Sequence, residues 1–282
     1  MTAGQQDGGQ LPIWELVRRA YGYVLHEQRH LVRLALPWLI GAYGLGLVPT
    51  LLSAAWREGA WGLAALVDGV GYAAVVVAWA RRLVLGEPWP RFAAPLHLPV
   101  LRFLLWSFLT MFLVLLPAGL LALVLLLILA GTLPAEPEAA PALGATALVF
   151  LLPFGLYLYI HVHLIFVPFA RAVDERLGFA ASWRLVRGKA LRLLAALALV
   201  ALPLLLLALV GAALLALLLA GGDELPMLPS EGGAVTVTGV LADLALRSIT
   251  YADAAITATF LAAAYVQLLK RAPACGPGRE GG

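Results

Sequence analysis

The sequence predicts an all-α integral membrane protein with six transmembrane helices, paired as three hairpins with cytoplasmic interfacial amphipathic helices. Three observations lead to this fold class. Apolar residues make up 62% of the chain and charged residues only 12%, whereas about a quarter of the residues of a soluble domain are charged. Six apolar stretches are each long enough to cross the roughly 30 Å hydrocarbon core of a bilayer. Basic residues gather at alternate ends of these stretches.

The apolar stretches divide the chain into three parts. Residues 1–33 are expected to form a cytoplasmic N-terminal amphipathic segment, 34–269 a six-helix transmembrane domain, and 270–282 a flexible cytoplasmic tail. A bilayer offers no partner for a free backbone N–H or C=O group, so the apolar runs must be helical. The predicted spans are about 34–54, 60–80, 103–131, 144–170, 193–221 and 248–269.

The distribution of Lys and Arg predicts the orientation of these spans. Every Lys and Arg except Arg57 and Arg247 lies in one of four patches. The patches are 18–33, 81–102, 171–192 and 270–279. Because cytoplasmic loops of membrane proteins are enriched in Lys and Arg, both termini are expected in the cytoplasm.

Composition also indicates the cellular setting. Arg far outnumbers Lys, and Ala, Leu and Gly are abundant, which is typical of a GC-rich bacterial genome and favours a bacterial inner (plasma) membrane. Residues 1–30 hold no uninterrupted apolar run, so no cleavable signal peptide is expected. The single cysteine, Cys275, excludes an intrachain disulfide and is expected to be an inert exposed thiol.

Each predicted hairpin follows a cytoplasmic segment, at 11–30, 83–100 and 176–190. The first and third segments have apolar and aromatic residues at helical spacing with Arg on other faces, which is typical of helices in the membrane interface. The second contains several prolines and is expected to be mostly extended, while Gly188 is expected to end the third helix. The candidate contacts to anionic lipid headgroups or to a partner protein are Trp14, Arg18, Arg19, Trp183, Arg184 and Arg187.

A shift of 90 residues superposes parts of the second and third units without gaps. It matches Arg81 with Arg171, and the spans that follow carry an internal proline each, Pro117 and Pro203. This agreement favours a degenerate internal repeat over a chance alignment of Leu- and Ala-rich sequence.

Ionisable residues inside the spans are candidates for function, because inserting one costs about 2.5–3.5 kcal/mol. Asp68 and Asp253 lie in the second and sixth spans, in the half away from the basic patches. As a buried carboxylate pair they would bind a proton or a cation. The alternative is that each bonds a hydroxyl or backbone group, or meets Arg247. Asp243 and Arg247 are spaced i, i+4 and are expected to pair.

His161 and His163 lie near the middle of the fourth span. Two residues of helix turn the chain through about 200°, so the rings point to opposite faces, and hydrogen bonding between helices is favoured over a metal site. No nucleophile, nucleotide-binding motif, metal site or cofactor site is recognised in the sequence. Neither enzymatic activity nor a nucleic-acid partner is therefore expected.

Residues 168–196 contain the segment Ala181-Ser182-Trp183-Arg184-Leu185-Val186-Arg187-Gly188. It resembles a segment of bacterial six-span proteins of unassigned function, and it is similar to the membrane domain of glycerophosphoryl diester phosphodiesterases. In those proteins the segment has the pattern Ala-x-Ser-Trp-x-Leu-x-Arg-Gly, whereas here no residue intervenes between the alanine and the serine. The hydrolase domain is absent, so no phosphodiesterase activity carries over. The resemblance implies a six-span architecture and an accessory role at the membrane.

The sequence favours a non-enzymatic multi-pass inner-membrane protein, an accessory or scaffold protein that organises lipid or a membrane complex. Its expected partners are anionic headgroups at the cytoplasmic face, or another membrane protein. The alternative is a small-solute or proton-coupled transporter that uses Asp68 and Asp253, because internal repeats and broken helices are common in transporters.

Overall fold

The computed structural model describes residues 12–51, 54–90, 97–132, 139–221, 226–228 and 235–271. Nine α-helices account for most of this part of the chain, and one short antiparallel strand pair accompanies them. The elements are α1 (Ile13–His26), α2 (Gln28–Leu51), α3 (Ala54–Leu85), α4 (Leu98–Thr132), α5 (Ala139–Leu164), α6 (Phe166–Ala172), α7 (Phe179–Val186), α8 (Ala190–Gly221), β1 (Pro226–Leu228), β2 (Val235–Thr236) and α9 (Val237–Arg271).

Five helical stretches of the described chain are long and apolar enough to cross a membrane. They are Gly62–Leu85 in α3, Leu98–Leu129 in α4, Val149–Ala172 through α5 and α6, Ala190–Leu214 in α8, and Leu241–Leu269 in α9. They coincide with the second to sixth predicted spans, so the helical membrane class is confirmed. The first predicted span, 34–54, lies largely in α2, which is helical but is not among these five. A total of six spans, with α2 as the first, therefore stays a prediction.

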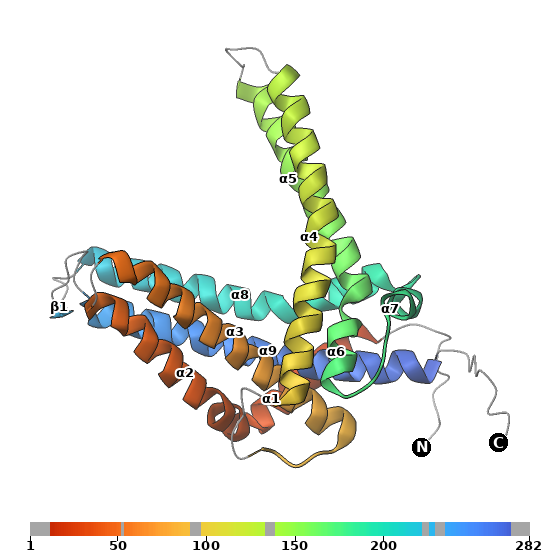
Figure 1. Ribbon diagram of the computed structural model, residues 1–282, viewed down its shortest axis with the longest axis horizontal. Helices are drawn as coiled ribbons and strands as arrows, with labels where there is room; N and C mark the ends of the chain where they lie inside the picture. Colours follow the sequence, from red (N-terminus) through yellow and green to blue (C-terminus); the bar gives the residue numbers. More distant parts are fainter. Residues whose placement is uncertain are drawn as a thin grey trace.

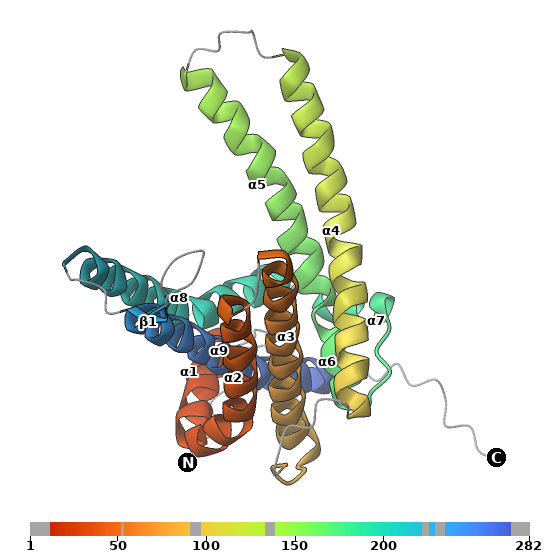
Figure 2. The ribbon, with the colours of Figure 1, turned by 60° about the vertical axis from the view of Figure 1, so that its left-hand side comes forward.

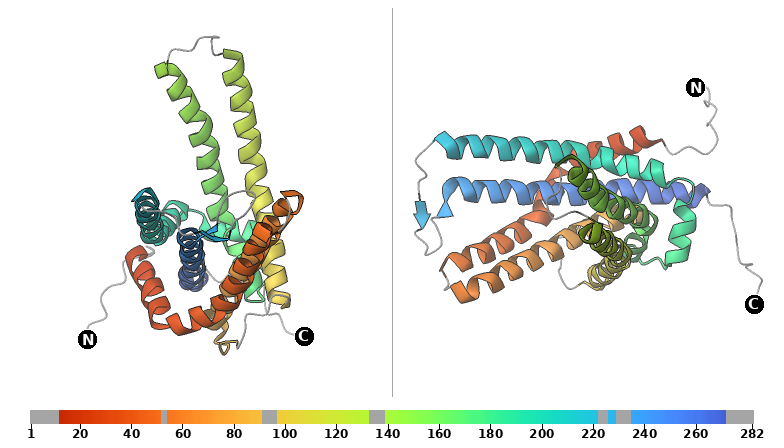
Figure 3. Two further views of the ribbon diagram at one scale, coloured as in Figure 1. Left: turned by 90° about the vertical axis from the view of Figure 1, so that its left-hand side faces the viewer. Right: turned by 90° about the horizontal axis from the view of Figure 1, so that it is seen from above.

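The long helices form two arms that point in different directions (Figures 1 and 2). One arm is the hairpin of α4 and α5, which projects away from the rest of the molecule. The other contains α2, α3, α8 and α9, with α8 and α9 side by side when viewed from above (Figure 3). The two arms meet where α3 ends and α4 begins, next to α6.

The hydrophobic core lies at this meeting point and along α9. The largest fully buried side chains include Trp79 of α3, Phe166 and Phe169 of α6, and Phe260 and Tyr265 of α9. In α9, 61% of the most apolar window is buried inside the protein, compared with 11% in α4. The last helix is therefore the central one, and α4 is covered by little of its own chain.

The N-terminal amphipathic segment packs against protein. Leu16, Val17, Ala20 and Val24 of α1 are buried in the core, and α1 contacts α9 and α8. The Tyr21 hydroxyl donates a hydrogen bond of 2.5 Å to the Val200 carbonyl of α8. The apolar side of α1 is thus covered by helices, and its polar side remains exposed.

Proline and glycine explain two helix ends. The fourth predicted span is interrupted at Ile165, between α5 and α6. Pro168 has no N–H to donate to the carbonyl of Leu164, which removes the helical hydrogen bond that would span this point. Gly188 follows α7 with φ +76°, a left-handed conformation that favours glycine. The expectation that Gly188 ends this helix is therefore confirmed.

The second cytoplasmic segment was expected to be mostly extended over 83–100. The structure shortens it, because α3 continues to Leu85 and α4 begins at Leu98. Residues 86–90 have no helix or strand, and residues 91–96 lie outside the described part of the chain.

Candidate functional site

The polar residues of the spans meet where α3 packs against α9. Arg247 of α9 forms an ion pair with Asp68 of α3. Its Nε donates a 2.6 Å hydrogen bond to Oδ2 of Asp243, which confirms the expected i, i+4 pair. The Tyr251 hydroxyl lies 3.4 Å from Oδ1 of Asp68 and donates to it. One guanidinium therefore pairs with two carboxylates.

Burial makes this cluster energetically important. The Arg247 side chain is only 14% exposed and that of Asp68 29% exposed. In a low-dielectric environment a buried charge needs a charged or hydrogen-bonded partner. The partners of Asp68 come from residues far along the chain, so the cluster joins α3 to α9 at this level.

Gly71 allows three helices to approach closely at the same level. A Cβ added to Gly71 would lie 2.5 Å from the Tyr251 hydroxyl oxygen and 2.8 Å from Cβ of Trp38. Trp38 belongs to α2. The space that a side chain at Gly71 of α3 would occupy is therefore filled by side chains of α2 and α9. The neighbouring Gly69 has nothing within 4 Å of such a Cβ, so only Gly71 has this role.

Asp253 has a separate set of partners. Thr257 donates a 3.3 Å hydrogen bond to Oδ1 of Asp253, and the Tyr72 hydroxyl is hydrogen-bonded to the same carboxyl group. The Tyr21 hydroxyl of α1 is also close enough to interact electrostatically. Within the described residues no cation pairs with Asp253. The structure therefore does not join Asp68 and Asp253 as one carboxylate pair.

The two histidines of α5 take part in aromatic packing. His163 is buried, its ring stacks on Trp183 at 4.1 Å between centroids, and its Nδ1 lies 2.8 Å from the Tyr159 carbonyl. The Ser182 hydroxyl donates a 2.6 Å hydrogen bond to the His163 carbonyl. The contacts of Trp183 and Ser182 thus attach α7 to α5, and Trp183 is partly covered by this packing.

His161 stacks on Tyr157 at 5.6 Å between centroids. The two histidines therefore have different neighbours, as the helical spacing predicts. In the described part of the chain, no group of three or more His, Cys, Asp or Glu side chains could hold a metal ion.

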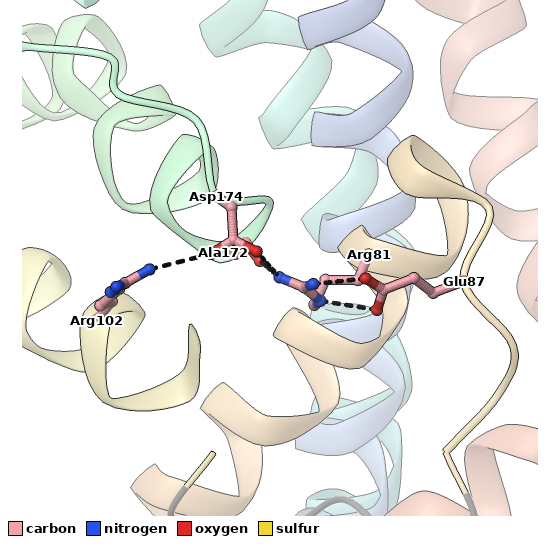
Figure 4. Close-up of polar contacts among 5 residues, drawn as sticks. All are labelled: Arg81, Glu87, Arg102, Ala172 and Asp174. Atoms are coloured by element: carbon pink, nitrogen blue, oxygen red, sulfur yellow. Dashed lines mark hydrogen bonds and ion pairs between the residues drawn. The ribbon is translucent and has the colours of Figure 1, made fainter. Parts of the chain in front are cut away.

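A network of ion pairs joins the two arms at their basic ends (Figure 4). Arg81 of α3 donates to Glu87 at 2.8 Å and 2.5 Å, to Asp174 at 2.5 Å, and to the carbonyl of Ala172 at 3.2 Å. Arg102 of α4 lies 3.2 Å from Asp174. Hydrogen bonds from Arg81 lower the pKa of both the Glu87 and the Asp174 carboxyl groups, and outweigh the opposite effect of burial.

The sequence did not point to Asp174, although its conformation is unusual. Its φ is +60°, the only positive φ of a described residue other than glycine, and Asp is one of the few residues that tolerate this region. Asp174 follows α6 and lies near α3 and α4 through its two arginine partners. The basic patches indicated Arg81 and Arg102, but no local pattern indicated the acid between them.

Trp89 belongs to an aromatic cluster. Its ring stacks on His30 at 4.9 Å and lies 4.7 Å from the ring of Trp79. The guanidinium of Arg82 lies 5.8 Å from the Trp89 ring centroid, within the range of a cation–π contact. This cluster attaches the 86–90 segment to α2 and α3.

The predicted headgroup contacts are mostly exposed. Trp14 is 71% exposed, and Arg18, Arg184 and Arg187 are exposed as well. Arg19 is exposed and pairs with Glu15 one turn earlier. These residues are available to groups outside the chain, whereas Trp183 is partly used in packing.

The fold and these clusters define an all-helical protein with several helices of membrane-spanning length, in which the polar groups lie at helix contacts. No family model, curated protein or solved structure matches the chain. The similarity of residues 168–196 to phosphodiesterase membrane domains therefore stays a prediction.

Proposed function

We propose that this protein is a non-enzymatic multi-pass inner-membrane protein that organises lipid around itself or supports a membrane complex by lateral contact. One observation supports this proposal above the others. The α4–α5 arm projects away from the other helices (Figure 2), and many of its large apolar side chains are exposed.

The exposed surface of the arm calls for an apolar environment. Phe108 of α4 is 75% exposed and Phe150 of α5 is 68% exposed, with many leucines between them. Contiguous apolar patches of this kind on a protein mark contact with a membrane or with another protein. The arm thus offers a long surface to lipid or to helices of a partner.

The basic ends of the arms favour anionic headgroups as neighbours. Arg18, Arg184 and Arg187 are exposed and belong to two of the basic patches of the sequence. Each Lys or Arg near an anionic membrane surface adds about 1 kcal/mol of attraction. A collar of such residues, which we define as Arg18, Arg184 and Arg187, would hold anionic lipid beside the arms.

Native mass spectrometry of the gently extracted protein tests this function. A stoichiometric protein partner or a retained set of anionic lipids is expected. The double variant Arg184→Gln/Arg187→Gln should reduce what is retained, whereas Arg57→Gln, on the predicted outer side, should not. Unchanged retention in the double variant would contradict the proposal.

The proposed topology has six spans, with α2 as the first span and both termini in the cytoplasm. Because all four basic patches are placed on one side of the membrane, the number of spans must be even. Cys275, the single cysteine, reports the side of the C-terminus. A membrane-impermeant maleimide should label it in inside-out vesicles and not in intact spheroplasts; the opposite result would reverse the orientation.

A second candidate, a proton-coupled transporter, is favoured by the surroundings of Asp253. Among the described residues, the Asp253 carboxyl group is near hydroxyl groups and pairs with no cation. Such a carboxyl group is suited to bind a proton. Asp253→Asn should then abolish proton flux in reconstituted vesicles, with Asp243→Asn as a control in the same helix. If proton flux and solute uptake are the same in Asp253→Asn and the unaltered protein, transport through this residue is excluded.

A further inference from the structure

A groove of about 720 Å³ lies between α1, the end of α3 and the last third of α9. This volume is within the range of sites that hold small molecules. Its lining includes Arg19, Tyr23 and His26 from α1, Leu83 from α3, and Ala263 and Gln267 from α9.

One end of the groove lies where two of the apolar stretches end. Leu83 is two residues from the end of the apolar stretch Gly62–Leu85, and Gln267 is two residues from the end of Leu241–Leu269. Both stretches end beside basic patches of the sequence. Thr259, at the other end of the lining, is eight residues before Gln267, or roughly 12 Å along the helix. The groove thus extends from the basic ends into the apolar region.

One side of the groove is basic. Arg19 and His26 are two turns apart on one face of α1, and both are exposed. Glu15 accepts one of the hydrogen bonds that the Arg19 guanidinium can donate, which leaves further N–H groups of that side chain. No acidic residue of the described chain lines the groove. The charge at this side therefore complements an anion.

The opposite side combines apolar walls with one unsatisfied acceptor. Leu83, Ala262, Ala263 and Val266 provide apolar surface. Oε1 of Gln267 is buried and has no hydrogen-bond partner within the described chain. A buried acceptor without a partner costs about 1–3 kcal/mol. A ligand hydroxyl group would supply the missing hydrogen bond once a rotation of the Gln267 side chain turns Oε1 toward the groove.

We propose that this groove binds one anionic phospholipid whose head carries hydroxyl groups, of which phosphatidylglycerol is the simplest. The phosphate lies at Arg19 and His26, a headgroup hydroxyl donates to Gln267 Oε1, and the acyl chains begin on the wall of Leu83 and Ala263. The inference rests on the lipid-organising function proposed above and gives it one specific site.

The test uses the full-length protein, delipidated in a neutral detergent. Phosphatidylglycerol, phosphatidylcholine and inorganic phosphate are titrated separately, and bound molecules are counted by native mass spectrometry alongside the midpoint of thermal unfolding. One phosphatidylglycerol per chain should bind and raise the midpoint, with phosphatidylcholine at least about fivefold weaker. Equal binding of both lipids would exclude an anion site, and binding of inorganic phosphate as tight as the lipid would exclude a role for the apolar wall.

Variants locate the bound lipid. Arg19→Gln should weaken phosphatidylglycerol binding about fivefold, whereas Arg29→Gln, at an exposed arginine of α2 that does not line the groove, should leave binding unchanged. Glu15→Gln removes the partner of Arg19 and should not weaken binding. Equal losses in Arg29→Gln and Arg19→Gln would show diffuse attraction to the basic surface and overturn the proposal.

Two further variants keep the inference testable if one fails to fold. Ala263→Phe fills the groove, and Gln267→Leu removes the acceptor at similar size; either one should reduce lipid retention. If Arg184→Gln/Arg187→Gln loses lipid but the groove variants do not, the groove is wrong and the proposed function stands. If only the groove variants lose lipid, the groove stands and the collar does not.

Discussion

Arg247 is the residue on which the α3–α9 contact depends most. It pairs with Asp68 and Asp243 and is 14% exposed. Removing Arg247 leaves two carboxylates without a cation. Because their side chains are 29% and 42% exposed, the cost should lie below the roughly 3–5 kcal/mol of a fully buried pair. Arg247→Leu should therefore lower the thermal unfolding midpoint in detergent much more than Asp68→Asn, which leaves Arg247 paired with Asp243.

A double-mutant cycle isolates the contact between Arg247 and Asp68. The double variant Asp68→Leu/Arg247→Leu should be more stable than Arg247→Leu alone, because it leaves one unpaired carboxylate fewer. Additive losses in the double variant would show that the two side chains do not interact in the membrane.

Gly71 should be intolerant of any side chain. Its added Cβ would lie closer than 3.0 Å to atoms of both Trp38 and Tyr251, so Gly71→Ala should destabilise the protein by about 1–3 kcal/mol. Gly69→Ala, two residues earlier with open space around it, should be neutral or stabilising by up to about 1 kcal/mol through helix propensity. The two thermal midpoints form a matched comparison, and equal midpoints would contradict this packing.

Tyr251→Phe provides a partial rescue of Gly71→Ala. It removes the hydroxyl oxygen but leaves the 2.8 Å approach to Trp38. The double variant should therefore recover some, but not all, of the lost stability. Full recovery would mean that α2 does not approach α3 as closely as the structure has it.

The sequence identified the polar residues of this site but not all of their partners. Asp243 and Arg247 are one helical turn apart, so their pair follows from spacing alone. The partner of Asp68 lies 179 positions later in the chain, and both Arg247 and a hydroxyl group were open alternatives. Only the packing of α3 on α9 decides that both contact Asp68, through Arg247 and Tyr251. The hydrogen bond between Tyr72 and Asp253 depends on the same packing of α3 on α9.

At the scale of elements, Asp174 joins the ends of three helices. It follows α6 and pairs with Arg81 of α3 and Arg102 of α4. Because its side chain is 44% exposed, each ion pair contributes about 1 kcal/mol or less. Asp174→Asn tests the pairs without disturbing the backbone, since Asn also tolerates a positive φ. A modest fall in the thermal midpoint is expected at neutral pH, and Asp174→Gly, which also permits this φ, should show a similar fall.

The pH dependence of this network has a definite sign. Arg81 lowers the folded-state pKa of Glu87 and Asp174, so their ionised forms stabilise the fold. That stability is complete above the ordinary carboxyl pKa of about 4 and is lost as the pH falls through the folded-state value. The unaltered protein should lose more of its thermal midpoint than Asp174→Asn as the pH is lowered through this range. Parallel curves for the two proteins would contradict the network.

The lengths of the helices followed from the sequence better than their arrangement. Unbroken Leu and Ala runs can only be helices in a bilayer, so α4 and α8 coincide closely with two predicted spans. Apolar runs on every face carry no information about which neighbour a helix meets. For this reason the central position of α9 and the projection of α4 and α5 were not predictable.

At the scale of the whole molecule, the two arms divide the protein by polarity. The arm of α2, α3, α8 and α9 contains the buried charges of α3 and α9, whereas the long apolar window of α4 in the other arm is only 11% buried. Lipid is as apolar as leucine and provides no force to pack such surfaces together. The low burial of this window is therefore compatible with a membrane environment, whereas it would be costly in water.

This argument predicts how the arm responds to charge. Leu115 and Leu101 of α4 are 48% and 43% exposed, but Leu115 lies 13 residues beyond Arg102, roughly 20 Å deeper along the helix. If lipid covers the arm, Leu115→Arg should cost about 2 kcal/mol or more and reduce the amount of protein in the membrane fraction. Leu101→Arg, next to Arg102 at the basic end, should have little effect, because its charge reaches the headgroups. Equal tolerance of the two variants would place the arm in water, and the proposed contact with lipid would then be wrong.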